Sequence, residues 1–428
     1  MKLKFWGVRG SIPSPIQSQP ISQKIVAALI EAGRTGVNLQ NKEAVEAFVA
    51  GLPFTVNSTI GGNTTCLTLE STDQLIIFDA GSGMRELGRY LMTREFAEGK
   101  GRAAIFFTHT HWDHIQGFPF FVPAFIPGNE FDVYHVHPYV PDVLNDQMDS
   151  RVFPAQFAAL GATFRFHKMD VGEMVSLGAF SISNIELQHP GKAYAYRVEK
   201  GEDVVVLATD GEYKRLDHPS LKRYIDFYRD ADMLIFDAQF SVRESFIKED
   251  WGHSSGLIGA DIARAAKVKR LVLFHHDPTS TDDEIMAALQ QTREYLTHHD
   301  RRGPVMVDVA REGWEVVFNS AGDFQVEEAN VDGLICLHLF GQFDARATET
   351  FMRSIVRVGQ AHQNETIVLN MAGLQEISVA GVRALLEARG DVYNLAIVNV
   401  PPNVYRVMEL SGTVDFFAIY PGLSDVPH

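Results

Sequence analysis

The segment that most constrains this chain is Phe107-Thr-His109-Thr-His111-Trp-Asp113-His114, where three histidines and one aspartate fall within six residues. It directly follows the apolar run 103–107, which has the composition of a buried β-strand. Imidazole and carboxylate groups on a loop at a strand end can converge on a metal ion. A single loop histidine is usually solvated, but this cluster of ligand-type side chains predicts a metal centre.

More ligand-type residues follow other short apolar runs. His189, Asp210 and His275 each come at the end of such a run, although any one of them alone would more often be structural. With the first cluster they make seven candidate ligands, enough for two divalent cations: His109, His111, Asp113, His114, His189, Asp210 and His275. We expect zinc, while manganese and iron accept the same ligand types. His276 is an alternative to His275, which we favour because it directly follows the strand.

The order and context of these residues resemble the metallo-β-lactamase superfamily over residues 1–320. The HxHxDH motif of that family matches residues 109–114, and its first aspartate motif matches Asp79-Ala-Gly. The resemblance implies an α/β fold, an αββα sandwich, in a dinuclear metal-dependent hydrolase. It also implies a division of the ligands: His109, His111 and His189 on one ion, Asp113, His114 and His275 on the other, Asp210 bridging, and Asp79 supporting the histidine loop without ligating.

A second resemblance concerns Asp237-Ala-Gln-Phe and the later Gly252-His253-Ser. In the ribonuclease Z and phosphodiesterase branch, an acidic residue at a strand end and a later histidine lie beside the metals. Asp237 and His253 match them, although Phe236, Gln239 and Ser255 depart from the branch's letters. Because a leaving alkoxide needs a proton, a histidine held by a carboxylate suits phosphodiester cleavage. Taken alone, Asp237 could be a turn residue and His253 a solvent-exposed group. Taken together, and with Asp113, they are the candidate catalytic residues.

Two observations narrow the range of expected substrates. Ribonuclease Z carries a long tRNA-grasping arm, commonly between the ligands that match His189 and Asp210, and this interval is too short here for an arm plus two strands. The net charge of −16 also repels polyanions. The opening residues 5–13, with 61–66, resemble a bacterial group described as cyclic-nucleotide phosphodiesterase-like. We therefore expect a small phosphodiester such as a cyclic nucleotide, and no long nucleic acid.

Other interpretations stay open. The same metals could serve a thioester or lactone hydrolase, or the hydrolase could be vestigial in a signalling scaffold. Arg9 could contact phosphate or form a structural ion pair. The aromatic stretch 117–128 could stack a base or could belong to the core.

Residues 14–53 read as an insertion with two amphipathic helical stretches, 22–32 and 41–50. A lid, a homodimer contact and a cover for the sheet are all compatible with this pattern. The two cysteines, Cys66 and Cys336, fall in different predicted domains, so no disulfide is expected. The chain shows no secretory leader pattern and no apolar run near the ~20 residues that span a bilayer. We therefore expect a cytoplasmic protein without membrane association.

Residues 324–428 resemble a STAS domain, the anti-sigma factor antagonist fold, after a polar boundary at 319–323. The expected elements are strands at 334–339, 366–369 and 396–400, helices at 345–358, 379–388 and 403–410, and a short strand near Phe416. Switchable STAS domains carry a phosphorylated serine where this chain has Ala380, so the phosphoswitch should be absent. Ser378 is expected to cap the following helix. The domain is then a docking or dimerisation surface for a protein partner, or a ligand binder.

Overall fold

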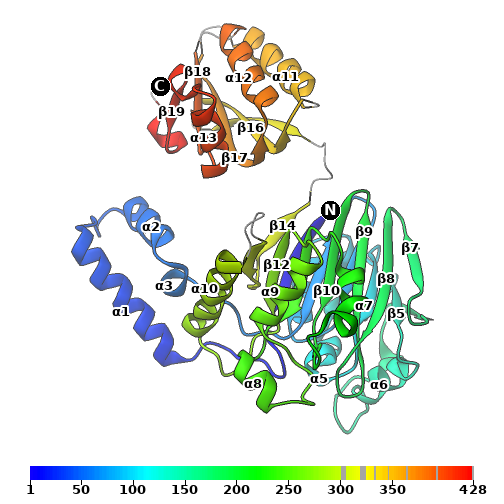
Figure 1. Cartoon of the computed structure of the whole chain (residues 1–428). Helices are drawn as coiled ribbons and strands as arrows, with labels where there is room; N and C mark the ends of the chain where they lie inside the picture. Colours follow the sequence, from blue (N-terminus) through cyan, green and yellow to red (C-terminus); the bar gives the residue numbers. More distant parts are fainter. Residues whose placement is uncertain are drawn as a thin grey trace. The chain divides into compact units, whose positions relative to one another are not determined.

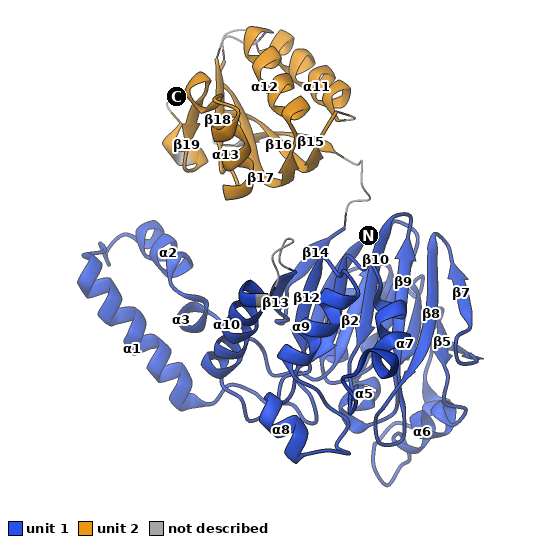
Figure 2. Cartoon of the chain, in the orientation of Figure 1, with its two compact units in different colours: residues 1–318 blue, residues 319–428 orange. Residues whose placement is uncertain are grey.

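The computed structural model describes residues 1–299, 305–318, 324–331, 334–345, 347–362, 365–391 and 394–426. The chain divides into two compact units, Met1–Phe318 and Asn319–His428 (Figure 2). The polar boundary predicted at 319–323 lies outside the described residues. Each unit is therefore considered by itself.

The described part of the first unit contains two seven-stranded sheets (Figure 1). The first has the order β14 (Glu315–Val317), β1 (Lys2–Gly7), β2 (Cys66–Glu70), β3 (Leu75–Phe78), β4 (Arg102–Phe107), β5 (Glu130–His135) and β6 (Thr163–Lys168). The second has the order β13 (Met306–Val309), β12 (Arg270–Phe274), β11 (Met233–Asp237), β10 (Asp203–Ala208), β9 (Ala193–Lys200), β8 (Phe180–Leu187) and β7 (Met174–Leu177).

Strand β4 shows why the sheets form layers. Ala104 and Phe106 pack in the core that both sheets share, whereas Ile105 and Phe107 point to the other face, into a core that includes α4 (Gly83–Leu91). Both faces of the strand are buried, so its sequence is a continuous apolar run. Helices on the second sheet are α7 (His218–Tyr228), α9 (Gly256–Ala265) and α10 (Asp282–His299). The helix–sheet–sheet–helix order confirms the predicted fold class.

The candidate ligands follow the carboxyl ends of strands that run in the same direction. Strands β10 to β13 are parallel, as are β3 to β6, so these ends gather at one edge of each sheet. Asp79, Asp210 and His275 each come directly or two residues after a strand and have positive φ angles of 58°, 58° and 59°. Such angles are uncommon outside glycine and concentrate at functional sites. Here they turn the chain sharply where each side chain leaves its strand.

The remaining helical segments lie in the loops and in the N-terminal insertion. The loop helices are α5 (Trp112–Ile115), α6 (Val140–Asp146) and α8 (Val242–Ile247), with 3-10 turns at Glu95–Glu98, Phe118–Phe120, Val122–Phe125 and Phe157–Ala159. The insertion forms α1 (Ser18–Thr35), α2 (Lys42–Gly51) and α3 (Phe54–Asn57), and Figure 1 shows α1 and α2 projecting from the sheets. No helix among the described residues is both long enough and apolar enough to cross a membrane.

The second unit is a five-stranded sheet with helices, as the STAS resemblance implies. Its elements are β15 (Gln325–Val331), β16 (Leu334–Phe343), α11 (Thr348–Ala361), β17 (Ile367–Ile377), α12 (Val379–Asp391), β18 (Leu395–Val398), α13 (Pro402–Leu410), β19 (Ala418–Tyr420) and 3-10 turns at Val414–Phe416 and Leu423–Asp425. The strand expected near Phe416 lies two residues later, because Phe416 ends a 3-10 turn. Ser378 Oγ accepts a hydrogen bond from Gly381 N at 3.3 Å, which is a helix-capping contact.

Candidate metal centre

Three histidines from two loops form the first cluster. The ring nitrogens of His109, His111 and His189 lie within 4.8 Å of one another and could hold a metal ion. His189 Nδ1 donates to the carbonyl oxygen of Gly252 at 2.9 Å, which leaves the lone pair of Nε2 facing His111. His109 Nε2 is buried without a hydrogen-bond partner. A buried polar nitrogen with no partner is costly, and a cation between the three rings would satisfy it.

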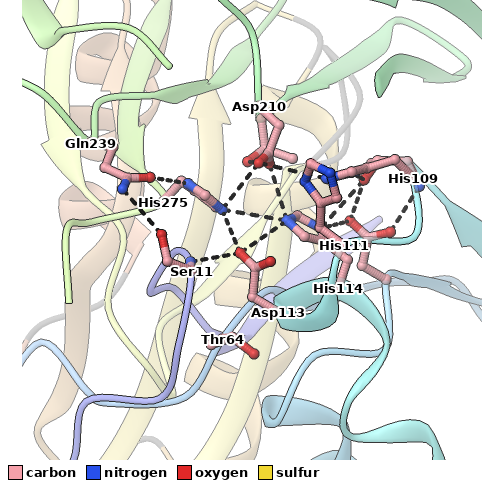
Figure 3. Close-up of polar contacts among 12 residues, drawn as sticks. Ser11, Thr64, His109, His111, Asp113, His114, Asp210, Gln239 and His275 are labelled. Carbon is pink, nitrogen blue, oxygen red and sulfur yellow. Dashed lines mark hydrogen bonds and ion pairs between the residues drawn. The ribbon is translucent and has the colours of Figure 1, made fainter. Parts of the chain in front are cut away.

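Two histidines and two aspartates form the second cluster, where Asp113, His114, Asp210 and His275 bring their ligand atoms together (Figure 3). The Nε2 atoms of His114 and His275 are 3.4 Å apart. Asp113 Oδ2 lies 3.1 Å from His275 Nε2 and 3.4 Å from His114 Nε2. All four side chains are buried. The set of two imidazoles and two carboxylates fits a divalent cation of the zinc, manganese or iron type.

Asp210 lies between the two clusters. Its Oδ1 is 3.9 Å from His109 Nε2 and 3.8 Å from His189 Nε2, and the same oxygen is 3.4 Å from His275 Nε2. Its Oδ2 is 3.2 Å from His114 Nε2. One carboxylate thus faces ring nitrogens of both groups, which is the arrangement that a bridging ligand requires.

Asp79 holds the histidine loop in place through hydrogen bonds. Its carboxylate accepts hydrogen bonds from Thr108 N, from Thr108 Oγ1 and from His114 Nδ1, each at 2.8 Å. The bond to Nδ1 directs Nε2 of His114 toward the second cluster. A carboxylate behind a ligand histidine fixes its tautomer and ring orientation.

Gln239 and Ser11 complete the surroundings of the second cluster, and the sequence interpretation assigned a role to neither. Gln239 Oε1 accepts from His275 Nδ1 at 3.0 Å, and Gln239 Nε2 donates to Ser11 Oγ at 3.2 Å (Figure 3). The backbone N–H of Ser11 donates to Asp113 Oδ2 at 2.7 Å. Gln239 therefore orients His275 as Asp79 orients His114. A hint of the role of Gln239 was present in the sequence, because this chain departs there from the motif of the ribonuclease Z and phosphodiesterase branch.

Asp237 and His253 meet beside both clusters. His253 Nδ1 lies 2.8 Å from Asp237 Oδ2, and the His253 ring stacks on His275 with centroids 5.1 Å apart. Asp237 also accepts three backbone N–H groups, so its lone pairs are occupied: Asp210 N at 3.0 Å, Gln239 N at 3.1 Å and Ser254 N at 3.2 Å. Asp237 and His253, with Asp210 and His275, form a third group of side chains that could hold an ion. Because its oxygens already accept backbone N–H groups, Asp237 is better suited to position His253 than to bind a cation.

The two clusters differ in the direction in which the pKa values of their histidines are shifted. Burial lowers the pKa of His109, His111 and His189, so these rings are neutral and have lone pairs for a cation. In the second cluster burial also opposes charge, but Asp210 and Asp113 outweigh it and raise the pKa of His275 to about 9. Protons on His114 and His275 therefore balance the two carboxylates until a cation displaces them.

The surroundings of three further groups bear on alternatives that the sequence left open. His276 faces away from the clusters and its Nε2 donates to Ala310 O, while burial lowers its pKa to about 3. Arg9 donates to the carbonyl oxygens of Gly61, Asp277 and Ser280 and is buried, so its role is structural. In the aromatic stretch, Phe118 and Phe121 are buried in the core, whereas Phe120 is exposed.

Comparison with known proteins agrees with this architecture. Residues 74–276 match the model of the beta-lactamase superfamily domain and residues 325–426 that of the STAS domain. Curated relatives include ribonuclease Z of Thermoplasma acidophilum, 23% identical over 50% of this chain and 80% of the relative. Ribonuclease Z of Bradyrhizobium diazoefficiens is 25% identical over 53% and 87%. Among solved structures, the metallo-beta-lactamase fold protein YhfI from Bacillus subtilis has a TM-score of 0.47 at 17% identity, covering 74% of this chain and 98% of that one.

Proposed function

Because this chain is a metal-dependent hydrolase that joins a metallo-β-lactamase domain to a STAS domain, we propose that it cleaves a small phosphodiester, such as a cyclic nucleotide. The observation that carries the proposal is the pair His253–Asp237, which lies against the candidate metal ligands. Hydrolysis of a thioester does not need such a proton donor, because a thiolate leaves readily, whereas expulsion of an alkoxide does.

The proposed ligands are divided between two cations. His109, His111 and His189 would hold one, and Asp113, His114 and His275 the other, with Asp210 shared by both. When bound, two divalent cations supply Lewis acidity toward phosphoryl oxygens and lower the pKa of water. The ligand types accept zinc, and also manganese or iron.

His253 would then protonate the leaving oxygen. Asp237 accepts from His253 Nδ1, which fixes the orientation of the ring and leaves Nε2 as the donor. Asp237 itself is held by three backbone N–H groups, which keeps the histidine in place. A general acid of this kind contributes about 100-fold to 10,000-fold to rate.

Two exposed tryptophans favour a substrate with a planar group. Trp112 is 81% exposed and directly follows His111 in the chain. Trp251 is 64% exposed and precedes Gly252, whose carbonyl oxygen holds His189. His111 and His189 contact each other, so each tryptophan is next in the sequence to a residue that belongs to the first cluster or holds one of its histidines. Indole rings stack on nucleobases, so we propose that they take the base of a cyclic nucleotide.

Long RNA is the less favoured substrate, although the curated relatives are named ribonuclease Z. Strands β9 and β10 occupy the interval between His189 and Asp210 and leave no room there for an arm. The chain also carries 54 acidic against 38 basic residues. A phosphate backbone is bound mainly through basic residues, so this balance supports a small substrate.

Leaving-group dependence tests the proposal. Wild type and His253→Ala are compared on cyclic nucleotides, whose leaving group is an alkoxide, and on bis(p-nitrophenyl) phosphate, whose leaving group departs without a proton. We expect His253→Ala to lose at least about 100-fold on cyclic nucleotides and little on the nitrophenyl diester. His218→Ala, an exposed histidine at the start of α7, is the matched control. A wild type that hydrolyses thioesters, lactones or tRNA precursors but no small diester would refute the proposal.

The STAS domain is proposed as an accessory docking domain for a protein partner. It has no hydroxyl at Ala380, and Ser378 Oγ is engaged in capping α12 and in a bond to Phe343 O. Both observations support a domain that binds without the phosphoswitch. Mass spectrometry of protein from its native host should therefore find no phosphate on residues 378–381.

A further inference from the structure

Helix α1 presents an apolar face that the described residues of its own unit leave exposed. Five large aliphatic side chains on it are 43–68% exposed: Ile21, Ile25, Val26, Leu29 and Ile30. At 100° per residue, the arc from Ile21 through Leu29 to Ile30 includes no charged residue. Solvated helix faces normally carry charges, so this face is built for contact with another surface.

The charged residues of α1 are used for other purposes. Lys24 Nζ donates to the carbonyl oxygens of Thr55 and Ser58 and pairs with Asp282 at 3.0 Å, which fastens the helix to the body of its unit. Glu31 and Arg34 bond to each other at 2.6 Å. The helix is therefore anchored on one side and apolar on the other.

Gly33 adds an independent indication. A glycine inside a helix costs about 1 kcal/mol relative to alanine. An added Cβ at Gly33 would meet no atom of the described residues within 4 Å, so no described neighbour in its unit requires the missing side chain. A glycine on an exposed helix face permits another backbone to approach closely. The position fits an interface better than it fits a solvated helix.

We propose that α1 packs against α1 of a second copy of this chain, forming a twofold-symmetric dimer. In such a dimer each patch meets its own copy, so a charged patch would face like charge. Two chains of net charge −16 repel each other, and an uncharged face is where they can meet. The same net charge opposes an anionic membrane surface, and the two basic residues of α1, Lys24 and Arg34, are already paired with carboxylates.

The area is adequate for such a dimer. The five aliphatic side chains expose roughly 500 Å² of apolar surface, a size that marks interaction sites on soluble proteins. A stable interface covers about 800 Å² on each partner. Uncharged polar residues within and beside the apolar arc would supply most of the difference: Ser18, Gln19 and Ser22 lie within it, and Gln23 beside it.

Sedimentation velocity of the full chain tests the proposal. We expect wild type at twice the chain mass at micromolar concentration, and Ile25→Glu with Leu29→Glu as a monomer, with a dimer dissociation constant at least about 100-fold higher. The control carries the same charges at exposed apolar positions of the body, Val152→Glu with Val171→Glu, and should stay dimeric. A monomeric wild type, or a dimer unaffected by the α1 variant, would overturn the proposal.

Cross-linking gives a result that does not depend on loss of assembly. Cys66 and Cys336 are buried, so Val26→Cys introduces an accessible thiol on the apolar face. A short bismaleimide should join two such chains in high yield, while Val171→Cys should give only background. Equal yields would contradict the proposed face. Protection of α1 from hydrogen exchange in a monomeric chain, or flotation of a monomer with anionic vesicles, would identify a different occupant and likewise overturn the proposal.

Discussion

Replacing Asp79 by asparagine should weaken metal binding at the second cluster without unfolding the chain. Asparagine matches the size of aspartate and tolerates the positive φ of 58° at this position. The carboxylate of Asp79 accepts three hydrogen bonds at 2.8 Å, from Thr108 N, Thr108 Oγ1 and His114 Nδ1. A carboxamide has one acceptor oxygen and must turn its N–H₂ group toward one side of this network.

The side it turns to decides the effect. The backbone N–H of Thr108 can only donate, so the amide nitrogen must face His114 and make Nδ1 an acceptor. The ring proton then moves to Nε2, the atom that faces Asp113 and Asp210. A protonated Nε2 cannot ligate. Loss of the group that orients a ligand typically costs 10-fold to 100-fold in metal affinity, or about 1.4–2.7 kcal/mol.

Chelator competition measures this change directly. Zinc affinity of wild type and Asp79→Asn is determined against a chromogenic chelator, with circular dichroism to verify the fold. Asp203→Asn removes another buried carboxylate, at the start of β10 and away from the clusters, and should bind zinc as wild type does. Wild-type affinity in Asp79→Asn, or an equal loss in Asp203→Asn, would refute the reasoning.

Three further predictions follow from single contacts. The pKa values of cation-free His114 and His275 are both raised, that of His275 to about 9, so a bound cation must displace two protons. Apparent zinc affinity should therefore rise by more than about tenfold per pH unit from pH 7 toward pH 9, measured by titration at fixed ionic strength. Gly252→Ala places a Cβ 2.1 Å from His189 Nδ1 at a φ of 86°, and should lower turnover at least about 10-fold by displacing a ligand. Gly172→Ala, at a φ of 82° with no atom within 4 Å, should leave turnover unchanged and cost only stability in a thermal melt. Trp112→Ala and Trp251→Ala should each raise KM for a cyclic nucleotide about 10-fold, since a base stack is worth ~1–3 kcal/mol, but not for a dialkyl phosphodiester; equal rises for both substrates would contradict base stacking.

Strand ends were predictable because two local signals coincide there. An apolar run followed within two residues by a ligand-type residue indicates a buried strand that delivers a side chain to a sheet edge, as after Phe107 and Phe274. The edge strand β15 was missed, because Gln325–Val331 includes two glutamates and pairs only with β16. A strand with one neighbour can keep polar side chains, so its sequence does not stand out.

The partners of the ligands could not be read from the sequence. Gln239 reaches back to His275, and the N–H of Ser11 reaches Asp113 across 102 positions. Backbone N–H and carbonyl groups are present at nearly every position, so the amino-acid sequence does not show which of them bonds to a site residue. The role of Arg9 was open for the same reason, since its acceptors are the carbonyl oxygens of Gly61, Asp277 and Ser280.

The central claim is that side chains from distant parts of the chain seat two cations around Asp210. Elemental analysis of the purified full chain, with Asp210→Ala alongside, tests it most directly. Wild type should carry two equivalents of a divalent metal per chain, and Asp210→Ala should carry fewer and lose turnover, because its carboxylate oxygens face both clusters. A wild-type protein that is metal-free and whose turnover is indifferent to added divalent ions would contradict the account.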